Sequence, residues 1–124
     1  MLITGLVSPL PAYRIAWRLN KTLSIRLVRK DDIQLQDKEA VASFPMFSCR
    51  QPITHTVYYL IGNRSEGSIY CTSLKMVDYI FLLKGTYYND RPEDHRNIFR
   101  SLEEIQAVIP VAASSIKQKD LFQF

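Results

Sequence analysis

The sequence has few of the residues on which metal binding and covalent catalysis depend: two cysteines, two histidines and four glycines in 124 residues. Cys49 and Cys71 are too few for a disulfide framework, and they show no CxxC or Cys/His spacing. His55 and His95 lie in different predicted elements, so we predict no zinc site. The glycines form no P-loop, GxGxxG or GxSxG motif. We therefore predict no metal and no cofactor and favour a non-enzymatic protein, while a triad assembled from distant residues stays open.

Long apolar runs are also missing. Residues 1–9 are apolar, but Pro9 and Pro11 interrupt the segment, no basic residues precede it, and it is far shorter than a membrane span. No repeat, low-complexity tract or linker-like stretch divides the chain. The length suits one folding unit with its own core, so we predict a single domain over residues 1–124, located in the cytoplasm and not in a membrane.

Acidic residues are absent from the first thirty positions. This stretch holds six basic side chains and carries +6, whereas the remainder of the chain carries −2. Such asymmetry favours an acidic partner such as nucleic acid. The candidate contacts are Arg14, Arg18, Lys21 and Arg26. A solvated helix face would give the same count, so the charge alone does not decide between these interpretations.

Apolar residues recur at helical spacing in two places. After Ser8, a candidate N-cap followed by Pro9, the stripe that includes Ile15 and Leu19 predicts a helix over residues 9–23. Asp90 and Glu93 form a capping box that predicts a second helix over residues 91–107. Its apolar stripe consists of Ile98, Phe99, Leu102 and Ile105.

Alternating and β-branched segments predict the strands. They cover residues 2–7, 23–28 with a continuation through Ile33 and Leu35 or a new strand there, 43–50, 54–61, 68–72, 77–84 and 109–114. Residues 62–67 are the turn of a hairpin. Pro45 predicts an edge strand or a bulge, and Pro110 predicts an edge strand. We expect the apolar tail that begins at Leu121 to pack on the core or on a partner.

This element order predicts an α+β fold. Two helices that bracket a run of antiparallel strands indicate a single, mostly antiparallel sheet of about five to seven strands with both helices on one face. The plan is ferredoxin-like with an inserted hairpin.

Four segments resemble one family. They are Leu-Ile-Thr-Gly-Leu at 2–6, Tyr-Arg-Ile-Ala-Trp-Arg-Leu-Asn at 13–20, Tyr-Tyr-Leu-Ile-Gly-Asn-Arg-Ser-Glu-Gly at 58–67 and Val-Asp-Tyr-Ile-Phe-Leu-Leu-Lys-Gly at 77–85. On these residues the chain resembles the IPExxxVDY family of uncharacterised bacterial proteins. Only half of the signature is retained: Cys-Thr-Ser occupies positions 71–73 in place of Ile-Pro-Glu, and Val-Asp-Tyr is present at 77–79. Because the family has no established activity, the resemblance implies a fold and no reaction.

Asp78 is the carboxylate that most needs an explanation. It belongs to a predicted strand with apolar residues on both faces, where a charge requires a cation or several hydrogen-bond donors. We predict Arg14 as its partner because Arg14 adjoins the apolar stripe of the first helix. The pair is either a structural ion pair or part of a ligand site. The candidate ligand-binding residues are Arg14, Asp78, Tyr79, Asn63 and Arg64.

Three functional hypotheses follow. The leading one is an interaction or scaffold-like domain that forms a homodimer, suggested by proline-marked sheet edges, many tyrosines and an apolar tail. The second is nucleic-acid binding through the basic first helix and the segment Arg26–Lys30, helped by base stacking on aromatic residues. Those residues are Trp17, Tyr58, Tyr59, Tyr70, Tyr79, Tyr87 and Tyr88, which cross-strand packing explains equally well. The third is a small-molecule-binding domain or an enzyme that uses Asp78.

Overall fold

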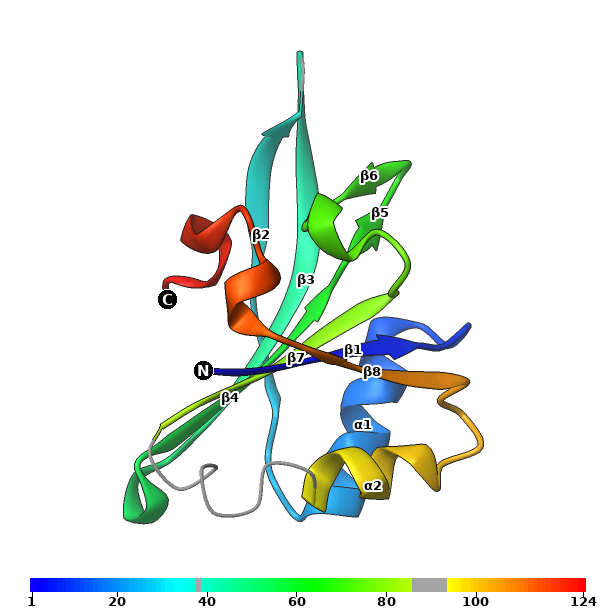
Figure 1. Cartoon of the computed structure of the whole chain (residues 1–124), viewed down its shortest axis with the longest axis vertical. Helices are drawn as coiled ribbons and strands as arrows, with labels where there is room; N and C mark the ends of the chain where they lie inside the picture. The colour runs from blue at the N-terminus through cyan, green and yellow to red at the C-terminus, as the bar shows by residue number, and fades with distance from the viewer. Residues whose placement is uncertain (38, 86–93) are drawn as a thin grey trace.

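The computed structural model describes residues 1–37, 39–85 and 94–124 and centres on a six-stranded antiparallel sheet in the order β2-β3-β4-β7-β1-β8 (Figure 1). The strands are β1 Leu2–Val7, β2 Val28–Asp37, β3 Ala40–Gln51, β4 Thr56–Gly62, β7 Tyr79–Lys84 and β8 Ala107–Val111. A separate hairpin consists of β5 Arg64–Ser65 and β6 Ser68–Ile69. The helices are α1 Ala12–Leu23 and α2 Asp94–Arg100.

The predicted α+β plan is confirmed. Both β1 and β4 pair antiparallel with β7, so they run parallel to each other with β7 between them. This is the split β-α-β arrangement of a ferredoxin-like sheet, with α1 after β1 and α2 between β7 and β8. The inserted hairpin is β2–β3, which precedes β4 in the chain and extends the sheet beyond it.

Both faces of the sheet are buried at its centre. In β7, Tyr79, Phe81 and Leu83 face α1 and α2, and we call this side the helix face. Ile80 and Leu82 point to the opposite side and join a second apolar cluster. Alternation along a strand places successive side chains on opposite faces, so a strand that is apolar throughout needs a cover on each side.

The second cover is the C-terminal segment of residues 112–124, which we call the strap. It includes the single-turn helices η4 Ala113–Ser115 and η5 Lys119–Phe122 and crosses the sheet on the side away from α1 and α2. Ile116 and Phe122 are buried there. The Tyr70 hydroxyl donates a hydrogen bond to the Leu121 carbonyl. The tail therefore packs on its own core, so it no longer supports a dimer by itself.

The first helix begins three residues later than predicted, at Ala12 and not at residue 9. Ser8 is not the N-cap; that position belongs to Pro11, which offers no side-chain hydrogen bond. The Ser8 hydroxyl instead donates to the Glu104 carbonyl, at 2.6 Å, and accepts from the Leu10 amide, at 3.3 Å. A serine favours this local turn as readily as a helix cap, which explains the error.

The predicted strand at 23–28 is also displaced, because α1 runs to Leu23 and β2 begins at Val28. Asn20 explains the gap. Its side-chain amide donates to the Leu27 carbonyl and its side-chain oxygen accepts from the Leu27 amide, at 3.2 and 2.7 Å. The end of α1 thereby satisfies backbone groups that would otherwise need a neighbouring strand. Ile33 and Leu35 extend β2, as one of the two alternatives predicted.

Pro45 lies in β3, which is an interior strand, so the second of the two predicted alternatives, an irregularity in the pairing, is the one observed. The pairing of β2 with β3 shifts between Lys30 and Ile33, opposite Pro45. On the other side Gly62 makes room: a Cβ atom there would lie 2.5 Å from Pro45 Cγ. The missing amide proton of a proline is tolerated where the ladder is already interrupted. Pro110 lies in β8, an edge strand, as predicted.

The second helix is shorter than predicted. Its described part ends at Arg100, and residues 101–106 form a turn before β8. Its predicted apolar stripe is only partly confirmed: Phe99, Leu102 and Ile105 are buried, but Ile98 is exposed, and Leu102 and Ile105 lie beyond the end of the helix. The Gln106 amide donates a hydrogen bond to the Val7 carbonyl at 2.7 Å. The chain therefore pairs with the end of β1 at this point and does not continue as a helix. The predicted capping box at Asp90 and Glu93 lies outside the described residues, as do Tyr87 and Tyr88.

We expect Phe122→Ala to lower the free energy of unfolding by about 3–5 kcal/mol, because the ring is 1% exposed and its removal leaves a cavity under the strap. Phe124→Ala is the matched control. That ring is 49% exposed, so its loss should cost about 1 kcal/mol or less. Chemical denaturation measures both. Equal losses would show that the strap does not cover the core.

Candidate functional site

Asp78 lies just before β7, and its carboxylate joins three segments that are distant in the sequence. One oxygen accepts a hydrogen bond from the Ser8 amide at 3.0 Å, and the other accepts from Arg64 Nε at 3.1 Å. Its backbone amide donates to the Leu6 carbonyl, and its carbonyl accepts from the Asn63 amide, both at 2.9 Å. Asp78 therefore ties the ends of β1 and β4 to the start of β7. We call Ser8, Asn63, Arg64 and Asp78 the polar knot.

The predicted pairing of Asp78 with Arg14 is wrong. The cation is Arg64, which follows β4 and whose guanidinium also donates to the Lys75 carbonyl. Arg14 is exposed on the outer side of α1. Helical spacing indicated correctly that Arg14 borders the apolar stripe, but the tertiary fold decides which cation meets the start of β7. Tyr79 points to the helix face, where its hydroxyl donates a hydrogen bond to the Leu10 carbonyl.

Asn63 is the best-satisfied polar side chain of the knot, although its residue is 0% exposed. Its amide nitrogen donates to the carbonyls of Leu74 and Val77, at 2.8 and 3.1 Å. Its side-chain oxygen accepts from the Cys71 amide at 2.9 Å. A buried amide with these partners organises the loop between β6 and β7 and has no donor left for a ligand.

The four predicted nucleic-acid contacts do not form one surface. Arg14 and Lys21 are exposed on α1, whereas Arg18 forms an ion pair with Glu104 at 2.5 Å. Arg26 follows the helix and lines a groove on the opposite side of the sheet. The structure thus divides the basic N-terminal segment between two faces of the molecule.

The outer side of α1 carries two exposed aromatic residues one helical turn apart. Tyr13 is 68% exposed and Trp17 is 57% exposed, and together with Arg14 they border a shallow depression. Lys21 Nζ lies 4.2 Å from the centroid of the Trp17 ring, a cation–π contact. We call Tyr13, Arg14, Trp17 and Lys21 the α1 patch.

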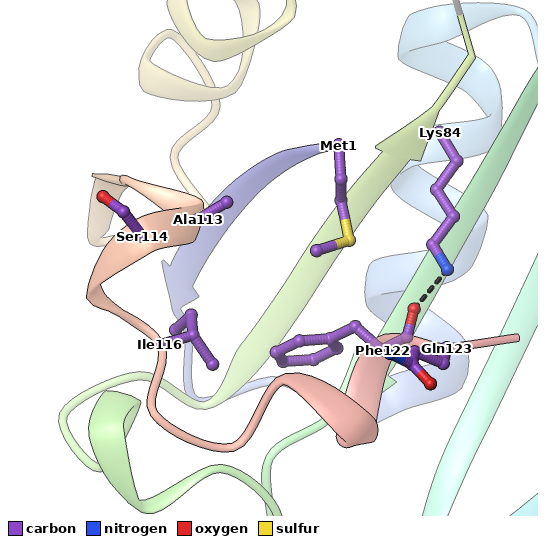
Figure 2. A pocket seen from close by; sticks show the side chains of 7 residues that line it. All are labelled: Met1, Lys84, Ala113, Ser114, Ile116, Phe122 and Gln123. Carbon is purple, nitrogen blue, oxygen red and sulfur yellow. Dashed lines mark hydrogen bonds between the residues drawn. The ribbon is translucent and has the colours of Figure 1, made fainter.

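A cavity of about 500 Å³ lies where the strap meets the start of β1 and the end of β7 (Figure 2). Met1, Ile116 and Phe122 supply most of its apolar lining. Lys84 reaches toward the strap and donates a hydrogen bond to the Phe122 carbonyl. Burial lowers the pKa of Lys84, because the surrounding apolar groups disfavour the ammonium form. In this arrangement Lys84 fastens the strap to β7.

A second cavity, of about 430 Å³, is a groove on the open part of the same sheet face. Its lining includes three cationic side chains, Arg26, Lys30 and Arg50, together with Tyr59. The sequence suggested Arg26 and Lys30 as nucleic-acid contacts and Tyr59 as a stacking residue, but it did not suggest Arg50 as a binding residue. Strand alternation within each segment could have placed them on one face, but their alignment depends on the register of β2, β3 and β4.

A buried polar group beneath α2 was also missed. Arg96 Nε donates to the Thr4 hydroxyl at 2.8 Å and its terminal nitrogen donates to the Ile3 carbonyl at 2.7 Å. His95 Nε2 lies 3.5 Å from the same hydroxyl. These contacts fasten α2 to β1, because buried polar groups need such partners. In the described parts of the chain, no three His, Cys, Asp or Glu residues gather as metal ligands would.

Neither protein-family models, nor curated proteins, nor solved structures contain a match to this chain. Within residues 1–37, 39–85 and 94–124, no helix is both long and apolar enough to span a membrane.

The polar knot predicts a specific coupling in a double-mutant cycle. We expect the Asp78–Arg64 pair to show about 0.2–1 kcal/mol of coupling in the free energy of unfolding, because both side chains are partly exposed. Asp78 and Arg14 should be additive within about 0.5 kcal/mol. Coupling of Asp78 to Arg14 that exceeds its coupling to Arg64 would contradict the observed geometry.

The buried tyrosines predict a loss of stability at alkaline pH. Burial raises the pKa of both Tyr70 and Tyr79 to about 12, with smaller contributions from Cys71 and Asp78 respectively. In the unfolded chain these phenols ionise near pH 10, so above that pH the unfolded state loses protons first. The free energy of unfolding should therefore fall between pH 10 and 12. Denaturation measured across this range should show a shallower fall for the double variant Tyr70→Phe/Tyr79→Phe; an unchanged slope would contradict this origin.

Proposed function

We propose that this chain is a non-enzymatic interaction domain that self-associates through the α1 patch. The observation that carries the proposal is the exposure of Tyr13 and Trp17 side by side on a helix whose other side is packed into the core. Tryptophan, tyrosine and arginine are the residues that most often dominate the energy of protein interfaces. More than half of each of these two aromatic side chains is exposed, and burial against another surface would remove that area from water.

The charges beside the α1 patch favour a second copy of this chain as the occupant. Arg14 and Lys21 supply positive charge, and the Arg18–Glu104 ion pair places the 103–104 turn next to α1. Glu103 is exposed in that turn. In a two-fold symmetric pair, the cations of one copy would meet the carboxylates of the other while the aromatic rings pack at the centre. A surface that carries both signs of charge beside an apolar centre is suited to this arrangement.

Family and location are part of the same proposal. Membership of the IPExxxVDY family is supported by the two longest segments of the resemblance, because residues 58–67 and 77–85 meet in the polar knot through Asn63, Arg64 and Asp78. A cytoplasmic location is supported by the two free thiols, Cys49 and Cys71, which a reducing compartment would preserve.

Self-association is tested by sedimentation velocity from micromolar to near-millimolar concentration, alongside the fluorescence of Trp17. Because Trp17 is the only tryptophan, its emission reports on the α1 patch alone. We expect a concentration-dependent shift to a dimer and a parallel blue shift of the emission. Trp17→Ala should weaken the dimer by roughly thirtyfold or more, the effect of losing an interface hot spot.

Ile53→Ala is the matched control, because Ile53 is 92% exposed and lies in the turn between β3 and β4. It removes an exposed apolar side chain that is not part of the α1 patch and should leave the dimer unchanged. A monomer at every concentration would refute the proposal. If a dimer forms and the emission of Trp17 does not change, the interface lies on a surface other than the α1 patch.

A further inference from the structure

The open part of the strap face presents a row of basic side chains across neighbouring strands. Arg50 of β3 pairs with Val57 of β4, and Val57 pairs with Lys84 of β7, so these three residues lie in one row. The pairs Lys30–Met46 and Met46–Ile61 connect β2 to the same face, because Met46 and Ile61 belong to the apolar cluster of that side. Arg26, Lys30, Arg50 and Lys84 therefore line one side of the sheet, and we call them the cationic row.

Aromatic rings lie next to the cationic row. Tyr59 lines the groove together with Arg26, Lys30 and Arg50. The ring of Phe124, at the end of the strap, lies 4.9 Å from the Tyr59 ring. Lys84 Nζ lies 5.6 and 5.2 Å from these two ring centroids. Tyr59 is only half-buried, so part of it stays accessible from the groove.

The side chains that line this groove include no carboxylate. In the neighbouring strand β2, the carboxylate of Asp32 forms an ion pair with Arg29. Three clustered cations without a lining acid attract a polyanion, because their like charges repel one another until an anion neutralises them.

We infer that the cationic row and Tyr59 form a binding site for single-stranded nucleic acid. Phosphates would contact Arg26, Lys30 and Arg50, and a base would stack on the Tyr59 ring. A positively charged groove beside aromatic rings on a sheet surface is the physical basis of single-strand binding. A duplex fits less well, since its bases are stacked on one another and offer no free face to the ring. The groove is open along the sheet and does not enclose a ligand, which favours a polymer with several contacts over a free nucleotide.

This site is independent of the proposed self-association. The α1 patch belongs to the helix side of the sheet, and the cationic row belongs to the strap side. It also differs from the basic surface that the sequence suggested, because Arg26 and Lys30 line the groove whereas Arg14, Arg18 and Lys21 of α1 do not. Each surface can therefore be removed by mutation while the other is kept.

The test is fluorescence anisotropy of the full chain with labelled oligothymidylate and oligouridylate at low salt and across a salt series. We expect binding that weakens with salt. Lys30→Gln/Arg50→Gln should reduce affinity strongly and reduce the slope of log K against log salt by about 1.4, for two lost phosphate contacts. Tyr59→Leu keeps an apolar side chain against the apolar cluster on the strap side of the sheet. It should weaken binding roughly tenfold, because the stacking of a base on the ring is lost.

Lys75→Gln/Arg100→Gln is the matched control, because it also removes one lysine and one arginine, both exposed and outside the groove. It should leave affinity and salt slope unchanged, and circular dichroism should show that all variants are folded. The proposal is overturned by the absence of binding at low salt, or by equal losses in the control. It is also overturned if mononucleotides bind as tightly as the oligomers, or if Arg14→Gln/Lys21→Gln abolishes binding while the groove variant does not.

Discussion

The fold depends on burying both faces of β7. Tyr79, Phe81 and Leu83 require a cover on one side and Ile80 and Leu82 on the other, because each exposed apolar face would cost several kcal/mol. One cover comes from α1 and α2 and the other from the strap. The first cover begins with α1, which ends at Leu23, and the second begins at residue 112, so both faces are covered only when both ends of the chain have packed.

The polar knot determines where this central strand begins. Asp78 holds the Ser8 amide and Arg64, while Asn63 satisfies the loop that precedes it. Every one of these groups is used within the fold. The segment Val77-Asp78-Tyr79 is therefore explained by structure: Val77 is buried in the apolar cluster beneath the strap, Asp78 ties three strand ends together, and Tyr79 packs under α1. A catalytic role is not needed to account for the carboxylate.

The two proposed binding surfaces lie on opposite sides of the sheet. The α1 patch combines exposed aromatic rings with mixed charges nearby, which suits a protein surface. Three cations of the cationic row line the groove together with a half-buried ring and no carboxylate, which suits a strand of phosphates. A domain that binds a polyanion on one face and a second copy on the other would present two binding grooves per dimer, which raises the effective concentration of each for a long strand.

The sequence by itself determined the α+β plan, the apolar stripe of the first helix and the edge position of Pro110, because these depend on local spacing and on proline geometry. Only the tertiary structure decided that Arg64 and not Arg14 meets Asp78, and that Arg26 joins Arg50 in place of Lys21. It also decided that Asn20 delays β2 and that Ser8 bonds Glu104 in place of capping a helix. Each of these outcomes depends on strand register and on contacts between distant segments. Periodicity shows which face a side chain occupies but not which residue lies opposite it.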